Sequence, residues 1–204
     1  LAEQMPKLTA TEKAAAEFGM ARGLTRHAGR PGLTAAEVTK CQAEAEAIFE
    51  RLSRDGGEKL AERAAGLLDA LRTLGVGRTA PEAVSQTLDA KPVKLSDYRG
   101  KVTVLDFWHV GCMPCRQMIP HQRAMMERLK GEPFATVSIS VDADKEEVTK
   151  FLAKTPMPWD HWHAGKETGI AADWKVMAFP TIYVLDAKGV IRFTDVRDAG
   201  VSLH

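Results

Sequence analysis

The feature that most constrains the fold is a pair of cysteines directly after an apolar run. The run at 102–108 has the composition of a buried strand, and Cys112 and Cys115 follow it. A helix that opens at this motif places the first sulfur at its N-terminus, where unpaired N–H groups and the helix dipole favour thiolate over thiol. The second thiol lies one turn later and can attack a mixed disulfide formed on the first. This order of strand, Cys-x-x-Cys and helix indicates redox chemistry.

The same cysteine spacing also occurs in one half of a zinc site. A structural zinc site needs four ligands, and the only other cysteine, Cys41, lies far upstream. His109 and His121 flank the motif, but His109 falls at the strand end and His121 lies beyond Pro120 on the helix. Redox chemistry is therefore favoured over a metal site, and no metal is expected.

Further motifs occur in order along the chain. Asp106 lies inside the strand before the cysteines, Pro120 follows Cys115 by five residues, and Phe179-Pro180-Thr181 precedes a last hairpin. Together these residues resemble the thioredoxin superfamily, and within it the extracytoplasmic TlpA/ResA-like thiol-disulfide oxidoreductases. The resemblance covers about residues 78–197. It implies an α/β thioredoxin-like fold, with a central mixed sheet flanked by helices.

The resemblance implies a role for each site residue. Cys112 is the exposed nucleophile, with a pKa of about 7 or below, and Cys115 is the less accessible resolving thiol. Asp106 exchanges a proton with Cys115, and burial is expected to raise its pKa. Pro180 is the cis-proline that brings the backbone of Phe179 against the sulfurs. The residues expected to contact the substrate are Trp108, Gly111, Met113, Pro114 and Phe179.

Two alternatives stay open, and two positions depart from the family pattern. Asp106 could instead cap local backbone, and Pro180 could be a trans proline at the start of a strand.

The family usually has Trp before the first cysteine, where this chain has Gly111. Many ResA-like proteins have Glu three residues after the second cysteine, where this chain has Met118. These departures concern the substrate class and leave the electron chemistry unchanged.

Residues 1–76 are predicted to form a separate helical segment. Thr9 and Thr34 each stand three residues before a Glu, the pattern of a capping box, and Pro31-Gly32 separates the two helices. A third apolar stripe at helical spacing ends before a glycine-containing linker. Cys41 lies on the apolar face of the second helix, and we expect an inert core thiol there.

The thioredoxin-like domain is expected to occupy residues 78–204, without the family's C-terminal helix. The segment 134–141 has strand composition, and a right-handed crossover would set it parallel to the strand at 102–108. Without the closing helix, one sheet face would need cover from another element. The apolar residues expected on that face include Ile182, Val184 and Ile191. Further predicted elements are helices at 144–154 and 168–174 and a hairpin turn at 186–189.

One histidine cluster lies outside these motifs. In His161-Trp162-His163, both imidazoles of an extended backbone would point to one side and could begin a metal site. No carboxylate or thiol ligand is near them in a suitable pattern. An ordinary loop anchored by Trp162 is therefore favoured.

The composition of the chain excludes some classes of binding partner. The chain has 28 Lys and Arg against 27 Asp and Glu, a net charge of +1, so no basic excess points to nucleic acid. No apolar stretch is long enough to span a bilayer, and no transmembrane segment is expected. The resemblance implies partners that are thiol- or disulfide-containing proteins, together with a redox partner that recycles the cysteine pair. It also implies a periplasmic or membrane-anchored location outside the cytoplasm.

The expected function is that of a protein-disulfide oxidoreductase that exchanges disulfides with protein or peptide thiols, without a bound cofactor. The alternative from a different class is a non-catalytic thioredoxin-like interaction module. A peroxidase is less favoured, because peroxiredoxins place a Thr three residues before the reactive cysteine and His109 occupies that position here.

Overall fold

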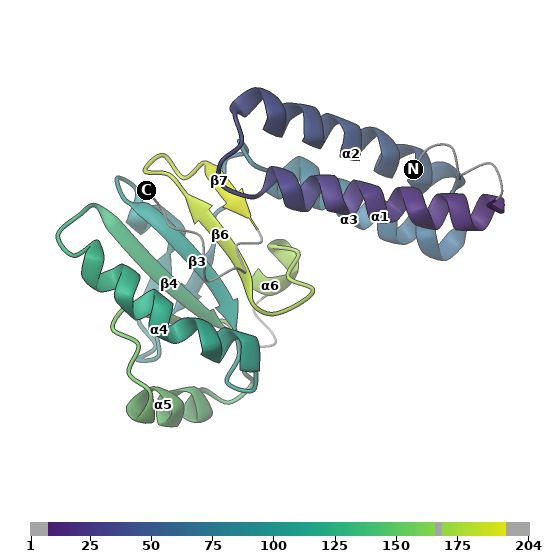
Figure 1. Cartoon of the computed structure of the whole chain (residues 1–204). Helices are drawn as coiled ribbons and strands as arrows, with labels where there is room; N and C mark the ends of the chain where they lie inside the picture. The colour runs from purple at the N-terminus through teal and green to yellow at the C-terminus, as the bar shows by residue number, and fades with distance from the viewer. Residues whose placement is uncertain (1–7, 166–168, 195–204) are drawn as a thin grey trace. The chain divides into compact units, whose positions relative to one another are not determined.

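The chain folds into two compact units, residues 1–76 and 77–204, in the computed structural model (Figure 1). The structure describes residues 8–165 and 169–194. None of the helices in these ranges combines the length and apolarity needed to cross a bilayer. The first unit consists of helices α1 (Ala10–Ala28), α2 (Ala35–Asp55) and α3 (Glu58–Leu74).

Both capping boxes predicted for the first unit are confirmed. The Thr9 hydroxyl accepts a hydrogen bond from the Glu12 N–H at 3.2 Å, and the Glu12 carboxylate accepts one from the Thr9 N–H at 2.8 Å. Thr34 and Glu37 form the same reciprocal pair at 3.3 and 2.8 Å. These bonds fix the starts of α1 and α2, because they satisfy N–H groups that have no partner within the helix.

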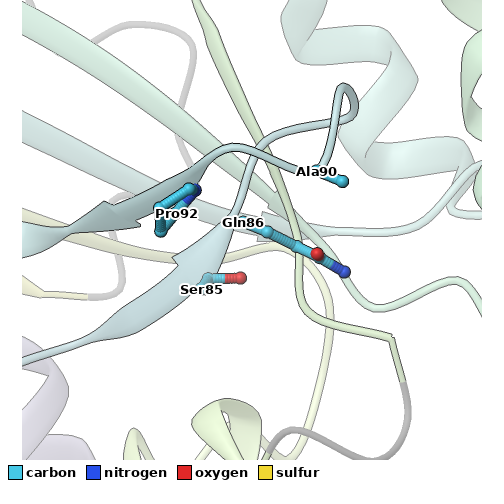
Figure 2. A pocket seen from close by; sticks show the side chains of 4 residues that line it. All are labelled: Ser85, Gln86, Ala90 and Pro92. Carbon is cyan, nitrogen blue, oxygen red and sulfur yellow. The ribbon is translucent and has the colours of Figure 1, made fainter.

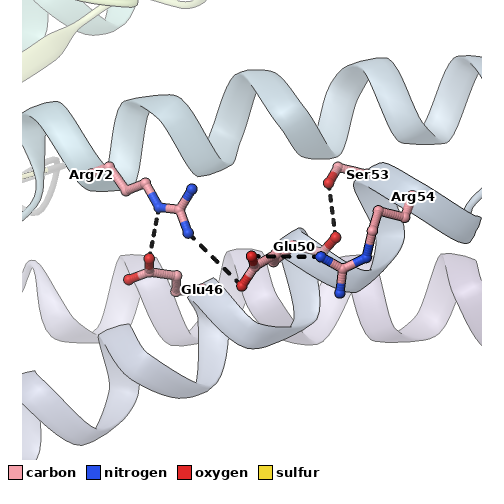
Figure 3. A network of polar contacts seen from close by, with 5 residues as sticks. All are labelled: Glu46, Glu50, Ser53, Arg54 and Arg72. Carbon is pink, nitrogen blue, oxygen red and sulfur yellow. Dashed lines mark hydrogen bonds and ion pairs between the residues drawn. The ribbon is translucent and has the colours of Figure 1, made fainter.

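The three helices pack through their apolar faces. The rings of Phe18 on α1 and Phe49 on α2 meet edge to face, with centroids 5.8 Å apart. Away from this core, Arg72 of α3 pairs with Glu46 at 2.7 Å and with Glu50 at 3.8 Å, both on α2 (Figure 3). Because solvent-exposed ion pairs contribute little, apolar burial is the main stabilising term. The buried core residues are Phe18, Ala21, Ala45, Phe49, Leu52, Ala64, Leu68 and Leu71.

Cys41 is half-buried and is not one of the core residues, which differs from the core position expected. The apolar stripe of α2 becomes fully buried only one turn later, at Ala45, and continues with Phe49 and Leu52. Helical spacing placed Cys41 on the correct face. The spacing could not predict which turns of α2 the neighbouring helices cover.

The main elements of the second unit are strands β3 (Val102–Trp108), β4 (Phe134–Ser140), β5 (Asp160–His163), β6 (Thr181–Leu185) and β7 (Ile191–Thr194), with helices α4 (Met113–Arg128), α5 (Lys145–Lys154) and α6 (Ile170–Asp173). The five strands form one mixed sheet in the order β5-β4-β3-β6-β7. β3 pairs parallel with β4, which confirms the parallel pairing predicted for these strands, and antiparallel with β6. The mixed sheet with its helices confirms the expected thioredoxin-like α/β fold.

A small hairpin precedes the central strand. β1 (Val84–Gln86) and β2 (Pro92–Lys94) pair antiparallel, and a short 3₁₀ helix, η2 (Leu95–Tyr98), leads toward β3. The Tyr98 hydroxyl donates to the Asp160 carboxylate at 2.8 Å, and its ring contacts that of Trp162 at a centroid distance of 6.0 Å. The entry segment is therefore anchored to the β5 edge of the sheet.

The sheet face that was expected to be open is covered by α4. Ile182 and Val184 are 3% and 6% exposed, and they pack near Met118 and Met125 of α4. Ile191 is buried as well, but it pairs with Leu185 and so lies on the opposite face of the sheet from Ile182 and Val184. The expectation was wrong because alternate residues of β6 point toward this helix. The predicted absence of a closing helix concerns residues 195–204, which lie outside the described ranges.

The segment around Trp162 is a strand and not the loop that was expected. Backbone pairing places Trp162 opposite Ile139 of β4, and the indole is fully buried. Pairing with an already formed strand decides the conformation here, because the segment is only four residues long and mostly polar.

Candidate active site

The cysteine pair lies at the N-terminus of α4 and is joined as a disulfide. Cys112 is the N-cap residue of this helix, and Pro114 lies in its first turn. The Cys115 N–H donates to the Cys112 sulfur at 3.2 Å. Helix N-termini present N–H groups without intrahelical partners, so the same position would stabilise a thiolate on Cys112 after reduction.

The two cysteines are almost equally buried in this oxidised form, which corrects the expectation that Cys112 is exposed. Cys112 is 5% exposed and Cys115 is 4% exposed. The disulfide places both residues in one apolar cluster with Ile119, and Phe179 packs against its edge. Sequence position predicts which cysteine begins the helix, but the cover over it comes from segments far away in the chain.

The loop that ends at Pro180 lies at the same end of the sheet as the disulfide. Thr181 is paired with Phe107, near the end of β3, and the Phe179–Pro180 peptide bond is cis, the isomer implied by the resemblance. Phe179 packs edge to face on the ring of His109, with centroids 5.0 Å apart. The backbone before Pro180 is thus held next to the segment that leads into Cys112.

The residues expected to contact a substrate differ in their exposure to solvent. Gly111, Met113 and Pro114 are exposed, and Phe179 is half-buried. Trp108 is only 1% exposed and packs on Phe151 of α5, at a centroid distance of 5.5 Å. Trp108 is therefore too buried to contact a substrate, which corrects the expectation. It points inward from β3 and supports the site by packing.

Asp106 lies buried beneath α4. It is 4% exposed, and its Oδ2 accepts a hydrogen bond from Gln122 Nε2 at 2.8 Å. Burial raises the pKa of Asp106 from its ordinary value of 3.8 to about 6, although the polar side chains of Gln122 and Ser138 beside it act in the opposite direction. Oδ1 accepts no hydrogen bond of normal geometry among the described residues. The alternative in which Asp106 caps local backbone does not fit this side-chain contact.

A second carboxylate anchors the loop before the cysteines. Both oxygens of Asp142 accept the Val110 N–H at 3.1 Å, and Oδ2 also accepts the Ser140 hydroxyl at 2.7 Å. His163 Nε2 lies 3.0 Å from the Asp142 carbonyl oxygen, so this nitrogen carries the proton and donates. These bonds connect the β4 and β5 strand ends to the segment just before Cys112.

The two histidines of β5 are occupied by backbone partners. His161 Nε2 donates to the Met157 carbonyl at 2.9 Å, and burial lowers the pKa of this imidazole. His163 donates to Asp142 as described above. Within residues 8–165 and 169–194, no three His, Cys, Asp or Glu side chains are grouped to hold a metal ion.

A shallow pocket of about 260 Å³ lies on the β1–β2 hairpin (Figure 2). Ser85 and Gln86 of β1 line it together with Ala90 and Pro92. These side chains offer a hydroxyl and an amide but no titratable group. The pocket therefore provides no obvious chemistry of its own.

The structure brings together most of the predicted site and adds residues that the sequence did not single out. Cys112, Cys115 and Phe179 lie in one cluster, and Asp106 lies beneath the same helix. Gln122 and Asp142 were missed. Both are polar residues whose partners lie 16 and 32 positions away, respectively, so no local pattern marks them.

The second unit matches known proteins. Residues 76–194, more than half of the chain, match the model of the AhpC/TSA family. The thioredoxin-like protein YneN of Bacillus subtilis is 35% identical over 122 residues, which are 57% of this chain and 68% of YneN. The thiol-disulfide oxidoreductase ResA of Bacillus cereus is 28% identical over 120 residues, which are 57% of this chain and 66% of ResA. The chain thus spans about two thirds of the length of these relatives.

A solved structure extends the likeness to three dimensions. The thioredoxin domain of a thiol-disulfide oxidoreductase from Bacteroides vulgatus superposes with a TM-score of 0.58 at 25% sequence identity. The superposition covers 61% of this chain and 91% of that chain. The region matched by the family model contains the cysteine pair, Asp106 and Pro180.

Proposed function

Because the chain belongs to the AhpC/TSA family and is a TlpA/ResA-like thiol-disulfide oxidoreductase of the thioredoxin superfamily, we propose that Cys112 and Cys115 exchange disulfides with protein or peptide thiols. The observation that carries the proposal is the disulfide between these residues at the N-terminus of α4. The cis bond before Pro180 and the buried Asp106 support it, since the resemblance implies both.

The exchange proceeds in two steps, written here for reduction of a substrate disulfide. The Cys112 thiolate attacks one substrate sulfur, and the other substrate sulfur leaves as a thiolate that takes up a proton from solvent. The Cys115 thiolate then attacks the Cys112 sulfur and displaces the remaining substrate thiolate. Two electrons pass to the substrate and the Cys112–Cys115 disulfide re-forms. The reverse sequence oxidises a substrate dithiol, and a redox partner recycles the pair.

Asp106 supplies the base for the second step. Its carboxylate accepts the proton of the Cys115 thiol, so that the thiolate is formed when the mixed disulfide is in place. With a pKa of about 6, Asp106 is mainly ionised at neutral pH and can still hold a transferred proton. A carboxyl with an ordinary pKa would be a weaker base for a thiol.

The substrate contacts of the proposal come from exposed residues in the cysteine motif and in the loop before Pro180. Met113 is 57% exposed and Met177, in the loop before Pro180, is 86% exposed. Unbranched thioether side chains adapt to varied apolar surfaces, which suits partners that differ in sequence. The partners are thiol- or disulfide-containing proteins, and the proposed location is outside the cytoplasm, as the family resemblance implies.

An insulin-reduction assay with thiol titration tests the proposal. The wild-type chain should accelerate insulin reduction by dithiothreitol, and Cys112→Ser should lose this activity. Cys41→Ser is the matched control, because Cys41 lies in the first unit and takes no part in the site. A folded wild-type chain without acceleration would favour the alternative, a non-catalytic interaction module.

A further inference from the structure

Gln122 is a buried polar residue of α4 with no part in the exchange steps described above. It is 5% exposed. The other buried residues of this helix, Cys115 and Ile119, precede it at helical spacing on the same face. Burying an amide destabilises a fold unless its polar atoms find partners. The partner of Gln122 therefore indicates why the position is polar.

That partner is the carboxyl of Asp106. Gln122 Nε2 donates to Asp106 Oδ2 at 2.8 Å, which connects α4 to β3. Two further oxygens of the same pair, Gln122 Oε1 and Asp106 Oδ1, are buried and have no hydrogen-bond partner in the described part of the chain. The pair thus uses one donor and one acceptor, and one acceptor oxygen on each side chain has no partner among the described residues.

A primary amide can bind either protonation state of a carboxyl group. Its NH₂ group donates to a carboxylate, and its carbonyl accepts from a protonated acid after a half-turn about the last side-chain bond. The unpartnered Oε1 of Gln122 is the atom that this turn would bring to the Asp106 O–H. An apolar side chain could do neither, and a Lys or Arg would favour only the charged carboxylate.

Among the described residues, the two that lie opposite Asp106 in the sheet carry no charge. Ser138 lies opposite it on β4, and Ile182 lies opposite it on β6. The Ser138 oxygen also accepts the Trp159 Nε1–H at 2.8 Å, so one of its hydrogen-bonding positions is taken. The titratable group on the buried face of α4 is Cys115 in its reduced form. Gln122 is the residue whose hydrogen bond to Asp106 the structure shows, and it is therefore placed to follow a proton on Asp106.

We propose that Gln122 is a positioning residue that holds the Asp106 carboxyl in both protonation states, by donating to the carboxylate and accepting from the acid. The inference rests on the proposed function, in which the S–H bond of Cys115 breaks, its electron pair stays on sulfur, and an O–H bond forms on Asp106. The Gln122 amide turns as that proton arrives, and it turns back when the proton leaves.

The test uses the oxidised full chain, in which disulfide exchange plays no part. The Asp106 carboxyl carbon is titrated by NMR in wild type, in Gln122→Met and in Gln117→Met. Gln117 is the matched control because it is an exposed residue of the same helix. Because the bond to the carboxylate is stronger than the bond to the neutral acid, loss of both should move the Gln122→Met midpoint about one pH unit upward, a tenfold change in the ionisation equilibrium. An unchanged or lowered midpoint, with Gln117→Met as wild type, overturns the proposal.

A second measurement needs no variant and remains decisive if Gln122→Met does not fold. In wild type, the side-chain NH₂ resonances of Gln122 should shift with pH at the same midpoint as the Asp106 carboxyl. Amide resonances that do not change at that midpoint overturn the proposal. The exchange rate against pH is then measured in reduced wild type and Gln122→Met. If the NMR results are as expected and the rate profile does not move, the positioning role stands and the proton transfer to Asp106 in the proposed function fails.

Discussion

Replacing Asp106 with Asn should stabilise the second unit, but only at pH values at which the Asp106 carboxyl is ionised. Burial raises the pKa of Asp106 from 3.8 to about 6, so the charged form is disfavoured by about 3 kcal/mol in the folded protein relative to the unfolded chain. This cost is absent below about pH 4, grows as the pH rises, and is complete above about pH 6. Asp106→Asn removes it, and the unpartnered Gln122 Oε1 can accept from the new amide.

Urea unfolding of the oxidised protein measures this difference. All four Trp residues lie in residues 77–204, so Trp fluorescence reports the second unit. Asp106→Asn should raise the free energy of unfolding by up to about 3 kcal/mol near pH 8 and leave it almost unchanged near pH 4. Asp144→Asn, at the exposed N-cap of α5, is the control and should have little effect at either pH, because Asn and Asp cap equally well. An equal gain at both pH values, or a loss near pH 8, would refute the reasoning.

Two further substitutions test the loop before the cysteines. Gly111→Trp should destabilise the second unit by about 1 kcal/mol, because a Cβ there lies 3.3 Å from the His109 ring and that ring is packed against Phe179. His109→Ala in the same chain should recover most of the loss in urea unfolding, and strictly additive effects would count against this contact. Asp142→Ala removes the acceptor of the Val110 N–H, so hydrogen exchange at Val110 should quicken about tenfold and disulfide exchange should slow. Unchanged hydrogen exchange at Val110 would show that Asp142 does not hold the loop.

Local patterns in the sequence predicted the parts of the fold that depend on neighbours in the chain. The Thr9 and Thr34 capping boxes could be predicted because both partners lie within one helical turn. The parallel pairing of β3 with β4 followed from the crossover rule, which depends only on the order strand, helix, strand. The raised pKa of Asp106 followed from a carboxyl placed inside an apolar strand.

The features that could not be predicted depend on contacts between distant segments. The hydrogen bond from Gln122 to Asp106 joins α4 to β3, and the bonds from Val110 to Asp142 join two loops at the strand ends. The burial of Cys112 depends on cover from distant segments and on the disulfide itself. The edge strand at Trp162 forms because β4 offers a backbone to pair with.

The central claim is that Cys112 attacks substrate disulfides and Cys115 resolves the product. Trapping tests it most directly: reduced Cys115→Ser is mixed with a disulfide-containing peptide, and the adduct is mapped by mass spectrometry. The account predicts a stable mixed disulfide on Cys112, because the resolving thiol is absent, and rapid release of the peptide by the wild-type chain. An adduct found on Cys41 instead, or no adduct on a folded and fully reduced Cys115→Ser chain, would contradict it.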